Sequence, residues 1–159
     1  MAARRLPGSL GSPRHATVPI RAYCLEELAL HQLETALRLY SVGDDFASVI
    51  TLAGAADEIF GKLLRASGRE SSLDEMTKAV IAIQERLFGE ATSAREVAWR
   101  ANHARNSLKH WDVGDPEIVK FDLAEEARDM LNRAIDNHWT LKESLTPAME
   151  EFQRAQRAA

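Results

Sequence analysis

Apolar residues recur at alternating intervals of three and four positions through most of this sequence of 159 residues. That period places them along one face of an α-helix, so each apolar stretch predicts an amphipathic helix. No stretch shows the alternation of apolar and polar residues that is typical of strands. The stretches end near residues that commonly terminate helices, namely Gly43, Gly68, Gly89 and Gly114. The sequence therefore predicts an all-α protein, an up-and-down bundle of four to five helices with a short C-terminal helix.

Polar residues with the spacing of N-caps precede several of these stretches. They are Asp44 or Asp45 before the second helix, Ser72 with Glu75 before the third, and Ser93 with Glu96 before the fourth. A fifth helix is expected to begin at Asp122, and Pro147 occupies the favoured first position of the last helix. The connections are short, so consecutive helices should be antiparallel neighbours. The small residues 53–56, at the centre of the second helix, should let a neighbouring backbone approach closely.

Two regions of different composition are expected. Residues 1–20 mix Gly, Pro, Ser and Arg without helical periodicity and predict a disordered basic tail, with contact to a partner as the alternative. Residues 21–159 predict a single helical domain. This second region is acidic, which argues against broad, sequence-blind binding of nucleic acid. Any site for a polyanion must therefore be local.

A cytoplasmic location is expected. The single cysteine, Cys24, cannot form an internal disulfide, which favours a reducing compartment. No apolar run approaches the roughly 20 residues that a membrane helix needs, so no membrane association is expected. Proline, glycine and arginine interrupt the N-terminal region where a signal peptide would have its apolar segment.

Residues 97–111 are predicted to form one continuous helix with two different faces. Its apolar face, expected to pack on the bundle, consists of Val97, Ala101, Ala104, Leu108 and Trp111. The opposite face consists of Trp99, His103, Asn106 and His110, and Arg105 flanks it. An outward face with an indole, two imidazoles and an amide is unusual, because solvated faces mostly carry Glu, Lys and Arg. This face therefore predicts a functional site, a subunit interface, or both.

Arginine, asparagine and histidine together suit transfer at phosphorus with general acid–base catalysis. Histidine is the usual side chain for moving protons in catalysis, and His110 can take that role, while the planar donors of Arg105 can stabilise charge on a phosphorane. Asn106 can orient the imidazole or bind a phosphate oxygen, and Lys109 adds positive charge. The Glu-x-x-His pairs of metal-binding bundles are absent, so neither a metal nor another cofactor is expected.

The segment Arg105-Asn106-Ser107-Leu108-Lys109-His110 resembles the motif of HEPN domains, the higher-eukaryote and prokaryote nucleotide-binding superfamily: an arginine, a polar residue, three further residues and a histidine. The resemblance implies a helical domain that dimerises, so that paired Arg and His side chains form a metal-independent ribonuclease site between two motif helices. Many members of that family resemble toxins of toxin–antitoxin or other defence systems. Others lack activity and only bind partners or nucleotides.

The sequence thus predicts a metal-independent endoribonuclease of HEPN type that forms a homodimer, cleaves an RNA substrate and has a possible antitoxin protein as its partner. Arg105, Asn106 and His110 are the candidate catalytic residues, and Trp99, His103 and Lys109 are candidates for substrate binding or the interface. The alternative is a catalytically silent helical module that binds a partner or a ligand.

Three acidic residues, Asp57, Asp112 and Asp115, are candidates for a supporting role, and two further histidines are expected in the core. Asp57 falls close to the apolar stripe of the second helix and needs a partner, for which Arg105 or Arg100 is the expected residue. With such a partner, Asp57 would position the arginine of the site. The alternative is an ordinary residue at the boundary between the core and the surface. Asp112 and Asp115 would repel RNA or support His110. His31 and His138 lie in or beside helical stripes and are expected to be core residues with bonded partners.

Overall fold

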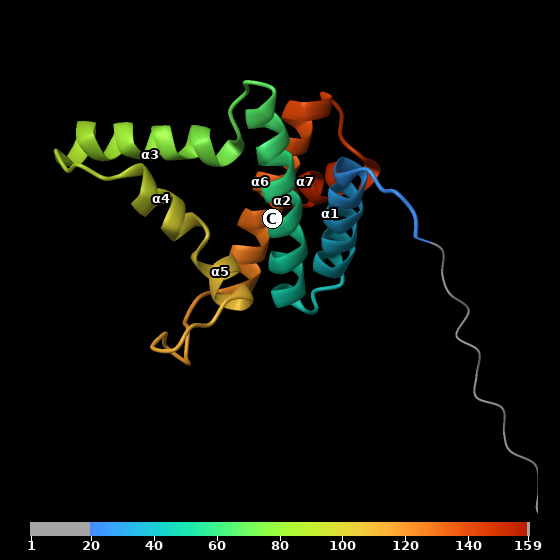
Figure 1. Cartoon of the computed structure of the whole chain (residues 1–159), viewed down its shortest axis with the longest axis horizontal. Helices are drawn as coiled ribbons and strands as arrows, with labels where there is room; N and C mark the ends of the chain where they lie inside the picture. Colours follow the sequence, from blue (N-terminus) through green and yellow to red (C-terminus); the bar gives the residue numbers. More distant parts are fainter. Residues whose placement is uncertain (1–19, 159) are drawn as a thin grey trace, which may run out of the picture.

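The computed structural model describes residues 20–158, which contain seven α-helices and no strand (Figure 1). The helices are α1 (Leu25–Ser41), α2 (Phe46–Ala66), α3 (Ser72–Phe88), α4 (Ala94–Ala101), α5 (His103–Lys109), α6 (Leu123–Lys142) and α7 (Pro147–Ala158). The all-α bundle is confirmed. The predicted tail lies outside the described residues except for its last position. Within the described part, no helix is both long enough and apolar enough to cross a membrane.

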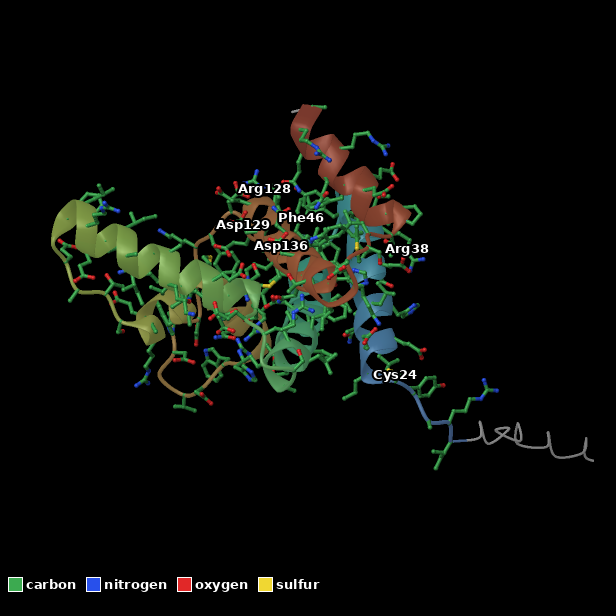
Figure 2. The ribbon with its side chains drawn as sticks, turned by 90° about the horizontal axis from the view of Figure 1, so that it is seen from above. Cys24, Arg38, Phe46, Arg128, Asp129 and Asp136 are labelled. Atoms are coloured by element: carbon green, nitrogen blue, oxygen red, sulfur yellow. The ribbon has the colours of Figure 1, made fainter. Side chains whose placement is uncertain are left out.

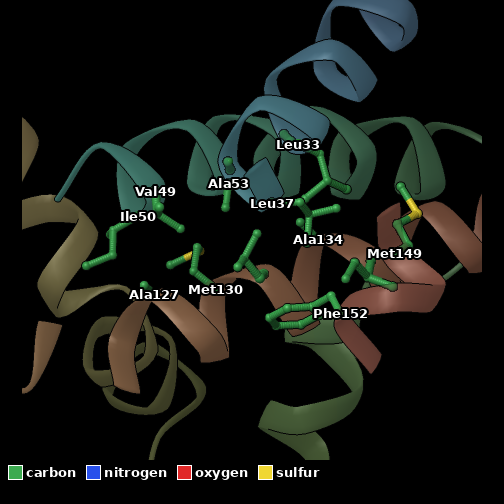
Figure 3. Close-up of a cluster of buried hydrophobic side chains, with 14 of the residues drawn as sticks. Leu33, Leu37, Val49, Ile50, Ala53, Ala127, Met130, Ala134, Met149 and Phe152 are labelled. Carbon is green, nitrogen blue, oxygen red and sulfur yellow. The ribbon is translucent and has the colours of Figure 1, made fainter. Parts of the chain in front are cut away.

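The core lies where α2 packs between α1 and α6, with α7 closing one side. Its buried apolar side chains include Leu33, Leu37, Val49, Ile50, Ala53, Ala127, Met130, Ala134, Met149 and Phe152 (Figure 3). The short connection after α1 makes α1 and α2 antiparallel, as expected (Figure 1). In contrast, α2 and α6 run parallel. Asp57 of α2 contacts Arg133 of α6, and one turn further along both helices Gly61 lies against Asn137.

Because α2 and α6 are parallel, a long connection must link the end of α2 to the start of α6. Part of this connection extends outside the bundle. We call α3 and α4, residues 72–101, the arm: α3 extends away from the core and α4 returns toward it (Figure 1). Only Thr77 of α3 is buried, whereas Ile83, Leu87 and Phe88 in its distal half are exposed. The arm therefore contributes little to the core and brings the chain back to the start of α5.

The N-caps follow the predicted chemistry, with one shift in position. Asp45 caps α2 by accepting a hydrogen bond from Ser48 N at 3.1 Å. The capping box of α3 is formed by Ser71 and Asp74, so the predicted pair Ser72 and Glu75 was displaced by one residue. Asp74 also accepts a hydrogen bond from Arg65 Nε at 2.9 Å, which a box one residue later would lose. Burial raises the pKa of Asp74, but the hydrogen bonds from Arg65 and Ser71 outweigh it and bring the pKa to about 2.

Ser93 caps α4 by accepting a hydrogen bond from Glu96 N at 3.2 Å. The Glu96 carboxylate does not close the predicted box. It binds Arg100 instead, at 2.7 Å, one helical turn further along α4.

The predicted continuous helix over residues 97–111 is wrong, because the chain breaks at Asn102 and leaves the helix after Lys109. Asn102 has φ −112° and ψ 5°, and its amide is bound by Arg133 of α6 and by the carbonyl of Ala98. Val97 and Ala104, on either side of the break, are buried as expected. Trp111, expected on the inner face, is 58% exposed because the chain has left the helix after Lys109.

Candidate functional site

Helix α5 lies against α2, and the side chain of Arg105 packs at this contact. A Cβ atom at Gly54 would lie 2.5 Å from Arg105 Cδ and 2.9 Å from Arg105 Cγ, so only glycine leaves room for this side chain in its present position. The small residues 53–56 therefore admit the stem of an arginine here, where we expected a neighbouring backbone. The stem of Arg105 is thereby packed on α2, and its side chain is only 19% exposed.

The Arg105 guanidinium has two polar neighbours. Its Nε and Nη2 donate to Asn106 Oδ1 at 3.4 and 3.2 Å, so two of the predicted site residues are in direct contact. Its Nη1 lies 3.7 Å from Oε2 of Glu58 on α2. The hydrogen bond from Lys62 is the main cause that lowers the pKa of Glu58, with smaller contributions from Arg105 and Lys109. The site is therefore a cluster of alternating charges at the junction of α5 and α2.

Glu58 was not predicted as a site residue. The signal was present in the sequence, since Glu58 follows Gly54 by one helical turn and shares its face of α2. The sequence does not indicate that this face of α2 contacts α5.

His110 follows the last turn of α5 rather than forming part of it. Its backbone is extended, with φ −133° and ψ 137°, and its N–H donates to the Asn106 carbonyl at 2.9 Å. The predicted stacking of His110 on Asn106 by a regular helical turn is therefore not present. Lys109 and His110 are both exposed, and the His110 imidazole makes no hydrogen bond or ion pair within residues 20–158. Both side chains are accessible to a ligand.

Trp99, His103 and Phe121 form an aromatic cluster on the outside of the α4–α5 junction. The rings of Trp99 and His103 are 5.0 Å apart and tilted by 35°, and Phe121 meets His103 edge-on at 6.3 Å. Trp99 is 60% exposed, which confirms its predicted outward position, whereas His103 is half-buried. Phe121 was not predicted because it belongs to the connection before α6, which has no helical pattern.

Asp57 is buried and has partners, as its position required, but neither predicted arginine is among them. Its carboxylate binds the guanidinium of Arg133 and accepts a hydrogen bond from Asn137 Nδ2 at 2.9 Å, both on α6. Arg105 is engaged by Asn106 and Glu58 instead, and Arg100 is held by Glu96 on the surface of the arm. The predicted direct contact of Asp57 with the site arginine is therefore wrong.

The same buried polar residues hold both ends of the arm. Arg133 donates to the Ala101 carbonyl at 2.8 Å and to Asn102 Oδ1 at 3.0 Å, at the junction of α4 and α5. Asn137 Oδ1 accepts a hydrogen bond from Ser72 N at 2.8 Å, at the start of α3. Asp57 thus acts on the site indirectly. It holds Arg133 in place, and Arg133 in turn holds Asn102, the residue that precedes α5.

The remaining predicted candidates lie apart from this cluster. Asp115 accepts a hydrogen bond from the backbone N–H of Asp112 at 3.0 Å, so it stabilises its own loop. His138 is buried against Phe60, with ring centroids 5.5 Å apart, whereas His31 is exposed and the prediction of a core position was wrong for it. Among residues 20–158, no group of three His, Cys, Asp or Glu side chains is arranged to hold a metal ion.

Comparison of the chain with models of protein families, with curated proteins and with solved structures finds no match.

Proposed function

We propose that this chain is a metal-independent endoribonuclease of HEPN type, acting as a homodimer, with Arg105, Asn106 and His110 as its catalytic residues. The observation that carries the proposal is the fixed guanidinium of Arg105, whose stem is packed on Gly54 and which is bound by Asn106, on a helix that ends in an exposed lysine and is followed by an exposed histidine. A positioned arginine and an accessible imidazole are the two groups that phosphoryl transfer without a metal requires.

The proposed reaction uses the substrate's own 2′-hydroxyl as nucleophile. This oxygen attacks the adjacent phosphorus as His110 accepts its proton, and the bond from phosphorus to the 5′-oxygen breaks as that oxygen takes a proton from the His110 imidazolium, which returns the histidine to its neutral form. Arg105 binds the phosphorane oxygens, where negative charge increases, and Lys109 attracts the RNA backbone. The products are a 2′,3′-cyclic phosphate and a 5′-hydroxyl. A role as the toxin of a defence system, restrained by an antitoxin protein, is part of the proposal.

The homodimer is proposed from the aromatic cluster. Trp99 leaves more than half of an indole in water, and an exposed indole beside imidazole and phenyl rings is typical of interface composition. A two-fold contact through α4 and α5 would bring a second Arg105 and His110 near the first pair.

The test is cleavage of a broad panel of single-stranded and structured RNAs by the purified chain. Arg105→Ala and His110→Ala should each reduce the rate about a hundredfold or more, since one acid–base group contributes roughly 10² to 10⁴. Arg154→Ala and His31→Ala remove the same residue types at exposed positions outside α4 and α5 and should leave the rate unchanged. Cleavage should persist in EDTA and stop when the substrate carries a 2′-deoxyribose at the cleaved position. Equal activity of the site variants and their controls contradicts the proposal.

A catalytically silent binding module is the second candidate, and one contact favours it. Glu58 lies 3.7 Å from the Arg105 guanidinium and competes with a phosphate for it. This candidate predicts that the wild-type chain cleaves no RNA of the panel, while Arg105→Ala and His110→Ala weaken the binding of a partner.

A further inference from the structure

A cavity of about 620 Å³ opens between α1, α6 and α7, and it shares no lining residue with the cluster around Arg105. Small-molecule sites of proteins are clefts of about 300 to 1,000 Å³ with mostly apolar walls and a few polar groups. The cavity has this size.

The floor of the cavity is apolar and rigidly held. Tyr40 and Phe152 meet edge to face in it, with ring centroids 5.3 Å apart and planes at 81°. Phe46 supports Tyr40 from the other side at 5.5 Å. At one end, the amides of Gln156 and Asn132 bind each other reciprocally, at 3.0 and 3.3 Å, which fixes α7 on α6. The cavity is therefore formed before any ligand arrives.

The charged groups of the wall are two arginines and one glutamate. Arg38 comes from α1, Arg128 from α6 (Figure 2), and Glu151 from α7. Arg38 donates to Thr35 Oγ1 at 2.9 Å and has no carboxylate within 4 Å among the described residues. Arg128 has only loose contacts on its own helix, 3.4 Å to Glu125 and 3.7 Å to Asp129. The lining residues thus carry a net positive charge, which is concentrated on Arg38 because the carboxylates of Glu125 and Asp129 lie beside Arg128. The hydrogen-bond donors of Arg38 are incompletely used.

We propose that this cavity binds a small amphipathic organic anion, with a flat apolar body on Tyr40 and Phe152 and a carboxylate or phosphate group on an arginine of the wall. An apolar floor selects the body of such a ligand, and the positive surplus selects its charge. A neutral molecule of the same shape leaves the arginines without a new partner, and a cation meets them with like charge. The site is independent of RNA cleavage, so failure of either proposal leaves the other intact.

The test is a titration of the ¹⁵N-labelled full chain with three probes of one shape: 1-naphthoate, neutral 1-naphthalenemethanol and cationic 1-naphthylmethylammonium. Naphthoate should bind saturably and shift the amide signals of Leu37, Tyr40 and Phe152. The alcohol should bind at least about tenfold more weakly, because a hydrogen bond to a charged group is worth roughly a factor of ten or more. The cation should bind most weakly. 1-Naphthyl phosphate against 1-naphthoate then compares phosphate with carboxylate as the anionic group on the same ring system.

Three variants assign the binding to this cavity. Arg38→Gln and Arg128→Gln each remove one cation, and at least one of them should weaken naphthoate binding about tenfold. Ala155→Trp should block the cavity, and thermal unfolding checks that it still folds. Arg154→Gln, which removes an exposed arginine of α7 outside the cavity wall, is the matched control and should bind as wild type.

Four results would overturn the proposal: no saturable binding of naphthoate, equal binding of the neutral probe, wild-type affinity in both arginine variants, or signal changes centred on the exposed side chains of α3. If Ala155→Trp does not fold, the two arginine variants still decide the outcome.

Discussion

The stem of Arg105 occupies the space that a side chain at Gly54 would need, with Arg105 Cδ only 2.5 Å from the position of a Cβ atom there. In the interior of a helix, alanine is normally more stabilising than glycine by about 0.5 to 1 kcal/mol. Gly54→Ala should lose this gain because Arg105 must move. In an Arg105→Ala background, the gain of about 0.5 to 1 kcal/mol in the free energy of unfolding should return. Urea unfolding of the four proteins measures this difference.

Gly61→Ala is the control for that cycle. Gly61 lies in the same helix, and a Cβ there would meet Ser71 and Asn137, not Arg105. Its effect on the free energy of unfolding should be the same with or without Arg105. Equal effects of Gly54→Ala in both backgrounds would mean that Gly54 does not position Arg105.

The sequence predicts the features that depend on residues close together in the chain, and it does not predict those that depend on residues far apart in the chain. The all-α class, the Asp45 cap, the outward position of Trp99 and the need of Asp57 for a partner follow from residues within a few turns of one another, and these predictions are confirmed. The break at Asn102 does not follow, because the apolar period continues through it. It depends on Arg133, which is 31 residues away in the sequence.

The shifted capping box of α3 shows the same limit at shorter range. Ser71 and Ser72 are each followed three residues later by an acidic residue, so the local pattern is satisfied twice. Arg65 decides between them because it reaches Asp74 from the end of α2. The contact of Arg105 with Gly54 and Glu58 also joins distant segments, and for this reason Glu58 was missed.

Loss of one member of the buried pair Asp57 and Arg133 should be strongly destabilising. Asp57→Asn leaves a buried guanidinium without its anion, and Arg133→Met leaves a buried carboxylate, so each should lower the free energy of unfolding by about 3 to 5 kcal/mol. The double variant should be less destabilised than the sum of the two. Amide hydrogen exchange in α5 should also increase in Arg133→Met, because Asn102 loses a bond.

The exposed pair Glu96 and Arg100 provides the comparison. Neutralising it by Glu96→Gln should change the free energy of unfolding by about 1 kcal/mol or less, as is usual for surface ion pairs. Additive effects of Asp57→Asn and Arg133→Met would contradict a coupled network.

Stability should decrease as the pH falls below neutrality because of His138. Burial lowers the pKa of this histidine from 6.5, so the folded chain binds its proton less readily than the unfolded chain. The contribution of neutral His138 is fully present above pH 6.5, decreases as the pH falls toward the lowered pKa, and is constant below it. Chemical unfolding between about pH 5 and 8 measures the slope. His138→Gln should reduce it, whereas His31→Gln, at an exposed position, should not.

The proposed homodimer makes Trp99 the side chain whose replacement should matter most for assembly. Trp99→Glu introduces a charge into the aromatic cluster with His103, and desolvating that charge in an interface is costly. The wild-type chain should be a dimer in light scattering at tens of micromolar, and the variant should be a monomer with an unchanged helical circular dichroism spectrum. Trp139→Glu changes a comparably exposed indole on α6 and should remain dimeric. A wild-type chain that is monomeric at this concentration, or a dimer that only Trp139→Glu dissociates, would place the interface elsewhere or remove it.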